Sequence, residues 1–170
     1  MRSTGKRSSK GAALCMCASV VVVIGHAHSA DDRDESRCRS VRGHAVTHTV
    51  PASACTSPVG FCTEGKVYGG LKGELTFVVS HFIDPMLPSI PNVTLYLGRS
   101  TIRTHRGDIL IGTDSGALDL KEGVGAALIT WTEGSGRFAG VSGYTRVSPS
   151  LDRETNTVFS EYEGQICVPR

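Results

Sequence analysis

Several side chains in the second half of this 170-residue chain could bind a small molecule or move a proton. The candidates for ligand binding combine acids, bases and aromatic rings: Arg103, His105, Asp114, Trp131, Tyr144 and Glu161. If their strand faces line a cavity, the charged groups could orient or protonate a ligand, and Trp131 could stack on it. The alternative is that the charged groups form weak ion pairs on an outer surface and that Trp131 packs in a core or between subunits.

Complete catalytic signatures are missing from the sequence. It contains no G-x-S-x-G motif of serine hydrolases. Glu133, Glu161 and Glu163 could form the carboxylate pair of a glycosidase if they met in space, but nothing in the sequence singles them out. His44 and His48 are four residues apart in an expected strand, so they would lie about 13 Å apart and could not share a metal. The catalytic residues therefore stay unknown, and we expect no metal and no cofactor.

Residues 134–139, GSGRFA, match the G-x-G-x-x-[GA] pattern of dinucleotide-binding sites. Such a site needs a helix that begins at these glycines and directs its N–H groups at the pyrophosphate. The residues that follow, GVSGYTRVSP, cannot form that helix. We predict instead a tight turn in which glycines adopt positive φ angles, with Phe138 closing one end of the fold.

Residues 1–30 have the order of a secretory signal peptide. A basic region without acids precedes an apolar run of about fifteen residues and a stretch of small residues. The run is shorter than the roughly twenty residues that span a membrane, so an uncleaved anchor is the less favoured alternative. Four of the eighteen basic residues and none of the sixteen acidic ones lie in this leader, which leaves a net charge of −2 after cleavage. We therefore expect a secreted or periplasmic protein that binds neither nucleic acid nor, after cleavage, a membrane.

Four cysteines remain once the leader is removed: Cys38, Cys55, Cys62 and Cys167. An even number of cysteines in an exported domain indicates disulfides, and three pairings are available. We favour Cys55–Cys62, which closes a short loop, and Cys38–Cys167, which joins the first segment to the last. Zinc binding is the alternative, but the sequence has no C-x-x-C pair.

The pattern after the leader predicts one all-β domain over residues 38–170, preceded by a loose charged tail over residues 31–37. Eight or nine short strands are expected, and no segment keeps a helical apolar period. Residues 71–82 alternate, with Leu71, Gly73, Leu75, Phe77, Val79 and His81 on one face. We expect a turn at Gly98-Arg99 between strands over 92–97 and 100–105, and a turn or a single helical turn over 115–123. Twenty glycines suit the turns of a curved sheet, and the Cys38–Cys167 bond favours a closed barrel over a sandwich.

The stretch GSGRFAGVSGYTRV, residues 134–147, resembles the allene oxide cyclase-like and dirigent-like barrel superfamily, in which a strand ends in a glycine turn of this kind. Residues 104–119 and the closing EGQIC look like its bacterial secreted members, so that the resemblance covers roughly residues 65–167. It implies an eight-stranded antiparallel β-barrel with a central cavity, often packed as a homodimer or homotrimer. It also implies an apolar substrate held without metal or organic cofactor. No catalytic residue can be carried over from the family residue by residue.

Two functions from different classes follow. The first is a secreted barrel that binds an apolar small molecule in its cavity, with a cofactor-free cyclase or isomerase as a close variant. The second is a structural, surface or matrix protein without catalytic activity, whose barrel is filled by its own side chains. A cavity of a few hundred Å³ with converging polar groups would favour the first, and a filled interior would favour the second.

Overall fold

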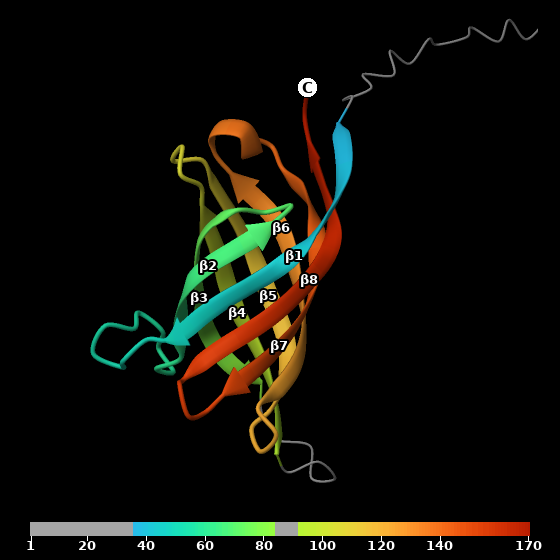
Figure 1. Cartoon of the computed structure of the whole chain (residues 1–170). Coiled ribbons are helices and arrows are strands. Elements are labelled where there is room, and N and C mark those ends of the chain that lie inside the picture. Colours follow the sequence, from blue (N-terminus) through green and yellow to red (C-terminus); the bar gives the residue numbers. More distant parts are fainter. Residues whose placement is uncertain (1–35, 84–91) are drawn as a thin grey trace, which may run out of the picture. The chain divides into compact units, whose positions relative to one another are not determined.

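Eight antiparallel strands form a closed barrel (Figure 1). The computed structural model describes residues 36–83 and 92–170, and the expected signal peptide (1–30) lies outside these described residues. Each strand pairs with the next one in sequence, and β1 also pairs with β8. The strands are β1 (Arg37–Thr49), β2 (Cys62–Gly69), β3 (Gly73–Ile83), β4 (Val93–Arg103), β5 (Ile109–Asp119), β6 (Val124–Gly134), β7 (Ser142–Asp152) and β8 (Thr157–Val168). The predicted eight-stranded antiparallel barrel is therefore confirmed, and its first strand takes in Arg37, the last residue of the expected tail.

The two ends of the barrel differ in how they are filled. The β2–β3, β4–β5 and β6–β7 connections lie at one end, the upper end in Figure 1. There four residues of the buried core, Leu110, Phe138, Val141 and Ile166, pack the interior, and we call these four the apolar cluster. The β1–β2, β5–β6 and β7–β8 connections lie at the opposite end. We call these the closed end and the open end.

The glycine turn between β6 and β7 forms the cover of the closed end. It contains a single 3₁₀ turn, η1 (Gly136–Phe138), and both Gly136 and Gly140 have positive φ angles, 60° and 69°. Phe138 is 2% exposed and belongs to the apolar cluster, as predicted. Since η1 spans three residues and β7 starts at Ser142, this turn is not the start of a dinucleotide-binding helix.

Both favoured disulfides are present. Cys38 and Cys167 are direct partners in the β1–β8 pairing, with their Cα atoms 3.9 Å apart. Cys55 and Cys62 close the loop that connects β1 to β2. The first bond thus joins the two strands that close the barrel, and the second shapes a loop at the open end.

The expected turn at Gly98-Arg99 was wrong, because β4 runs without interruption through both residues. Gly98 is needed for close packing rather than for a turn. A Cβ added to it would lie 2.7 Å from Cε2 of Phe77 on β3. Similarly, β5 continues through residues 115–119, where we expected a turn or a helical turn, and the chain reverses at residues 120–123.

The predicted alternation of β3 holds as far as Val79 and then fails. Val79 pairs with Gly98 and His81 pairs with Leu97, so Ser80 is an extra residue that forms a β-bulge. A bulge shifts the period-two alternation by one position. Val79 is therefore fully buried, whereas His81 is exposed on the outer surface instead of sharing its face.

Tyr162 connects β8 to the turn between β2 and β3. Its hydroxyl accepts a hydrogen bond from the buried N–H of Leu71 at 2.8 Å and lies within donating distance of the carbonyl oxygens of Tyr68 and Leu71, at 2.9 and 3.2 Å. In Tyr162→Phe the Leu71 N–H loses its partner without gaining water. We expect the free energy of unfolding, measured by urea denaturation, to fall by about 1–2 kcal/mol.

Tyr144→Phe is the control for this change, because Tyr144 is 42% exposed on the outer surface. Its effect should stay within about 0.5 kcal/mol. Equal effects of the two substitutions would contradict a stabilising role of the Tyr162 hydroxyl.

Candidate functional site

The interior between the apolar cluster and the open end is a cavity of about 300 Å³. Its wall is mainly apolar and comes from all eight strands. Leu120, Gly123 and Arg153, from the β5–β6 and β7–β8 turns, line its mouth. The volume lies at the lower end of the range of about 300–1,000 Å³ that is typical of ligand pockets.

Small inward-facing residues explain why this barrel is not filled. An eight-stranded barrel is just wide enough for its own side chains to fill it when these are large. Here Ala45, Ser100, Ala127 and Ser160 line the cavity from four different strands. Their short side chains leave the central space open.

Asp114 on β5 is the buried acid of the cavity wall. It is 5% exposed and accepts two hydrogen bonds from β4: from the Tyr96 hydroxyl to Oδ1 at 3.1 Å, and from the Ser100 hydroxyl to Oδ2 at 2.8 Å. Gly98 on β4 pairs directly with Asp114, so Tyr96 and Ser100 are its two diagonal neighbours on the inner face. We call these three residues the Asp114 cluster.

Two glycines flank Asp114 on the inner face of β5 and make room for large rings. A Cβ added to Gly116 would lie 2.8 Å from the Tyr96 hydroxyl oxygen, and one added to Gly112 would lie 2.8 Å from Cε3 of Trp131. The sequence G-x-D-x-G on β5 therefore places a carboxyl group between two aromatic side chains.

Burial dominates the electrostatics of the Asp114 cluster. It raises the pKa of Asp114 from 3.8 to about 6, and the hydrogen bonds from Ser100 and Tyr96 only partly oppose this rise. Burial, together with the neighbouring charge of Asp114, also raises the pKa of Tyr96 above its usual value. At neutral pH Asp114 is therefore mostly a buried carboxylate, whereas Tyr96 keeps its proton.

No cation neutralises this carboxylate within the part of the chain that the structure describes. Among the described residues that line the cavity, Arg153 is the one with a cationic side chain. Its guanidinium group donates hydrogen bonds to the carbonyl oxygens of Leu120 and Lys121 at the mouth. Among the described side chains, Asp114 thus accepts hydrogen bonds only from neutral hydroxyl groups.

Aromatic rings line the route from the mouth to the Asp114 cluster. The rings of Phe61 and Phe77 meet edge to face at 6.3 Å, and those of Phe77 and Tyr96 do so at 5.5 Å. Deeper in the barrel Trp131 is 1% exposed and donates a hydrogen bond from Nε1 to the Thr145 hydroxyl at 3.2 Å. All five of these residues line the cavity.

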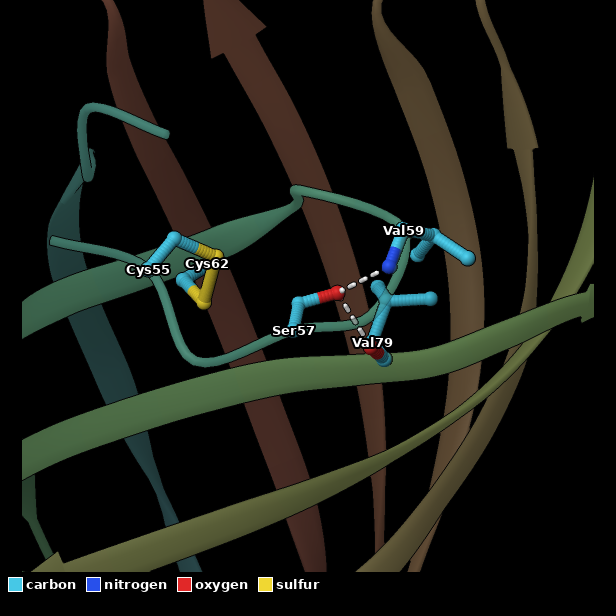
Figure 2. Close-up of a disulfide and its surroundings, with 5 residues drawn as sticks. All are labelled: Cys55, Ser57, Val59, Cys62 and Val79. Carbon is cyan, nitrogen blue, oxygen red and sulfur yellow. Dashed lines mark hydrogen bonds between the residues drawn. A yellow bond between two sulfur atoms is a disulfide. The ribbon is translucent and has the colours of Figure 1, made fainter. Parts of the chain in front are cut away.

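The outermost of these rings, Phe61, belongs to the loop that the Cys55–Cys62 disulfide closes, and Figure 2 shows this disulfide. Within this loop the Ser57 hydroxyl donates to the carbonyl oxygen of Val79 on β3 and accepts from the N–H of Val59. The N–H of Val79 in turn donates to the carbonyl oxygen of Phe61 at 3.0 Å. The disulfide and these hydrogen bonds fasten the loop to β3 and fix Phe61 at the open end.

The structure separates the six candidate residues into two groups. Asp114 and Trp131 line the cavity. Arg103, Tyr144 and Glu161 are exposed on the outer surface, and His105 lies in the exposed β4–β5 turn. On β7, for example, Thr145 and Val147 line the cavity, so Tyr144 between Gly143 and Thr145 points outward.

Tyr96 and Ser100 complete the Asp114 cluster, but they were not among the candidate residues from the sequence. The expected turn at Gly98-Arg99 placed them on different strands. The signal that could have found them is the alternation Tyr96, Gly98, Ser100, Ile102, which predicts one continuous inner face if Gly98 is taken as a strand residue.

Residues 36–83 and 92–170 contain no group of three or more histidine, cysteine or acidic side chains placed to hold a metal ion. Over the same residues there is no helix of sufficient length and apolar character to cross a membrane.

Comparisons of the chain with models of protein families, with curated proteins and with solved structures found no match. The fold, the cavity and the Asp114 cluster are therefore the observations from which a function can be inferred.

Proposed function

We propose that this protein is an exported barrel of the allene oxide cyclase-like type that binds an apolar small molecule in its central cavity. The observation that carries the proposal is the cavity of about 300 Å³, with a mainly apolar wall into which the Asp114 cluster brings a buried carboxyl group. Burial of apolar ligand surface against this wall would provide affinity, at roughly 25 cal/mol per Å² before the costs of association. The Asp114 cluster would orient the ligand.

A structural protein with a packed barrel is the second function that the sequence allows. Large inward side chains would fill such a barrel. The small residues Ala45, Ser100, Ala127 and Ser160 instead leave space in this one, which favours ligand binding.

Export to a secreted or periplasmic location is part of the proposal. It is supported by the two disulfides, because such bonds form and persist in oxidising compartments. The signal-like order of residues 1–30 points in the same direction.

A cofactor-free cyclase or isomerase is a variant of the same proposal. The cavity would hold a flexible substrate close to its product conformation. The carboxyl group of Asp114, when protonated, could donate its proton to a substrate oxygen and recover one from the product. An isomerisation of this kind consumes no other reactant, because the proton returns within the turnover.

Blocking the cavity tests ligand binding directly. Ala127 lines the cavity, so the ring in Ala127→Phe would occupy ligand space. We expect this variant to bind the neutral fluorescent probe N-phenyl-1-naphthylamine at least about tenfold more weakly than the wild type, which corresponds to about 1.4 kcal/mol. The measurement is a fluorescence titration with the probe.

Ala126→Phe is the matched control, since the neighbouring Ala126 is exposed on the same strand. It should leave the affinity unchanged, and urea unfolding should show that both variants remain folded. Absence of probe binding to the wild type, or equal affinities of the two variants, would favour the structural protein instead.

A further inference from the structure

The buried carboxyl group of Asp114 in the cavity wall indicates a more specific class of ligand. We propose that the cavity binds an apolar amine, whose protonated nitrogen pairs with the Asp114 carboxylate while its apolar part lies against the aromatic wall. This inference rests on the proposed function, because it requires a ligand inside the barrel.

The hydrogen bonding of Asp114 leaves acceptor positions open. A carboxylate has about four lone-pair positions on its two oxygens, so it can accept more than two hydrogen bonds. Among the described residues each oxygen of Asp114 receives one side-chain hydrogen bond, from Tyr96 and from Ser100 respectively. Since Asp114 also lines the cavity, a ligand ammonium group could donate to the remaining positions.

Among the described residues, no cationic side chain forms an ion pair with Asp114. The titratable side chains that line it, apart from Asp114, are Tyr96 on β4, Asp119 at the end of β5, Tyr162 on β8 and Arg153 at the mouth. The described lining residues from β1, β2, β3, β6 and β7 carry no charge. The guanidinium group of Arg153 donates its hydrogen bonds to two backbone carbonyl oxygens at the mouth instead.

A neutral apolar ligand would stabilise the ionised carboxyl group of Asp114 less than a protonated amine would. Asp114 is 5% exposed, so entry of a ligand would remove its remaining contact with solvent, and a buried charge without a partner is costly. A protonated amine replaces that water with an opposite charge and with hydrogen-bond donors. The difference should appear as selectivity for an amine over an uncharged molecule of the same shape.

The aromatic side chains around Asp114 favour the same ligand. The faces of tyrosine, phenylalanine and tryptophan rings attract an ammonium group, most strongly where water is excluded. Tyr96 donates its hydroxyl hydrogen to Asp114, and Phe77 packs against Tyr96. An amine paired with Asp114 would therefore lie beside electron-rich rings as well as beside the carboxylate.

A ligand with a carbonyl oxygen is the alternative, and it predicts the opposite pH dependence. A carbonyl group could accept a hydrogen bond only from protonated Asp114, which is the minor form at neutral pH because its pKa is about 6. Binding of an uncharged acceptor should therefore strengthen below pH 6. Binding of an amine should weaken there, since protonation of Asp114 removes the anion.

Isothermal titration calorimetry with two matched probes tests the inference. The probes are 2-(1-naphthyl)ethylamine, which stays protonated over the range used, and 2-(1-naphthyl)ethanol, its uncharged counterpart. For the wild type at pH 7.5 we expect the amine to bind about thirtyfold more tightly than the alcohol, the lower end of what a buried charge pair contributes. At pH 5 this preference should fall at least about fivefold, because most of Asp114 is then protonated.

Asp114→Asn should abolish the preference for the amine while the variant still binds the alcohol and N-phenyl-1-naphthylamine. Glu161→Gln is the matched control, because it removes one negative charge from the exposed outer surface and should keep the preference. The pH comparison uses the wild type alone and so does not depend on how well a variant folds.

The remaining outcomes separate the two proposals. Equal affinity of the wild type for the amine and the alcohol at pH 7.5, with N-phenyl-1-naphthylamine still bound, would overturn the amine inference and leave the binding barrel in place. Stronger binding of the alcohol at pH 5 than at pH 7.5, without an amine preference, would assign a hydrogen-bond acceptor as the ligand instead. If none of the three probes bound, the proposed function itself would fail.

Discussion

Replacing both Cys38 and Cys167 by serine is expected to lower the free energy of unfolding by about 5 kcal/mol. The two residues are 129 positions apart in sequence, so the disulfide removes a large loop-closure entropy from the unfolded chain. It also joins β1 to β8, the pair of strands whose contact closes the barrel. Urea denaturation at neutral pH, with the wild type measured under the same conditions, provides the comparison.

The double variant of Cys55 and Cys62 is the control for loop length. These residues are only 7 positions apart, and the same entropic relation gives about 2 kcal/mol for their bond. A loss for this pair as large as that for Cys38 and Cys167 would contradict loop-closure entropy as the main source of the stabilisation.

Asp114 should make the ligand-free protein less stable at neutral pH than in mild acid. Its pKa is raised from 3.8 to about 6 on folding, so the native state holds this proton more tightly than the unfolded state does. Its contribution to stability is therefore complete below about pH 3.8 and is lost as the pH rises through about 6. A shift of this size corresponds to about 3 kcal/mol, and solvent screens it little because Asp114 is only 5% exposed.

Comparison of the wild type with Asp114→Asn isolates this contribution from those of the other acids. The free energy of unfolding of the variant, minus that of the wild type, should rise by about 3 kcal/mol between pH 3 and pH 7. A difference that stays constant over this range would mean that Asp114 titrates in the folded protein as it does in the unfolded chain. Saturation with an amine that pairs with the carboxylate should reduce the rise, because the ligand would stabilise the ionised form.

The elements of the barrel were largely predictable from local residue patterns. Alternating strand patterns, turn residues and the lack of a helical apolar period predicted an all-β domain, and the structure forms a closed barrel of eight strands. The positions of the four cysteines, two close together and two near the ends of the domain, were enough to favour the correct pairing. The glycine turn with Phe138 at the closed end followed from residue type, because few residues other than glycine adopt positive φ readily.

The sequence-based predictions were wrong at residues whose type is compatible with two different local structures. Gly98 is equally suited to a turn and to close packing inside a strand, and only the position of the Phe77 ring on the neighbouring strand distinguishes the two. The bulge at Ser80 likewise depends on how β3 pairs with β4, and it moved His81 to the outer surface. No pattern within β3 alone contains this information.

Residue types thus determined that the chain forms strands and where most turns fall, and the cysteine positions favoured one of three possible pairings. The tertiary structure decided which face of each strand became the inside. Side chains alternate with a period of two, so a shift of one residue in register exchanges every inward position for an outward one. Register depends on pairing between strands, and it alone brings Tyr96 and Ser100 of β4 together with Asp114 of β5 around one cavity while it turns Tyr144 and Glu161 away.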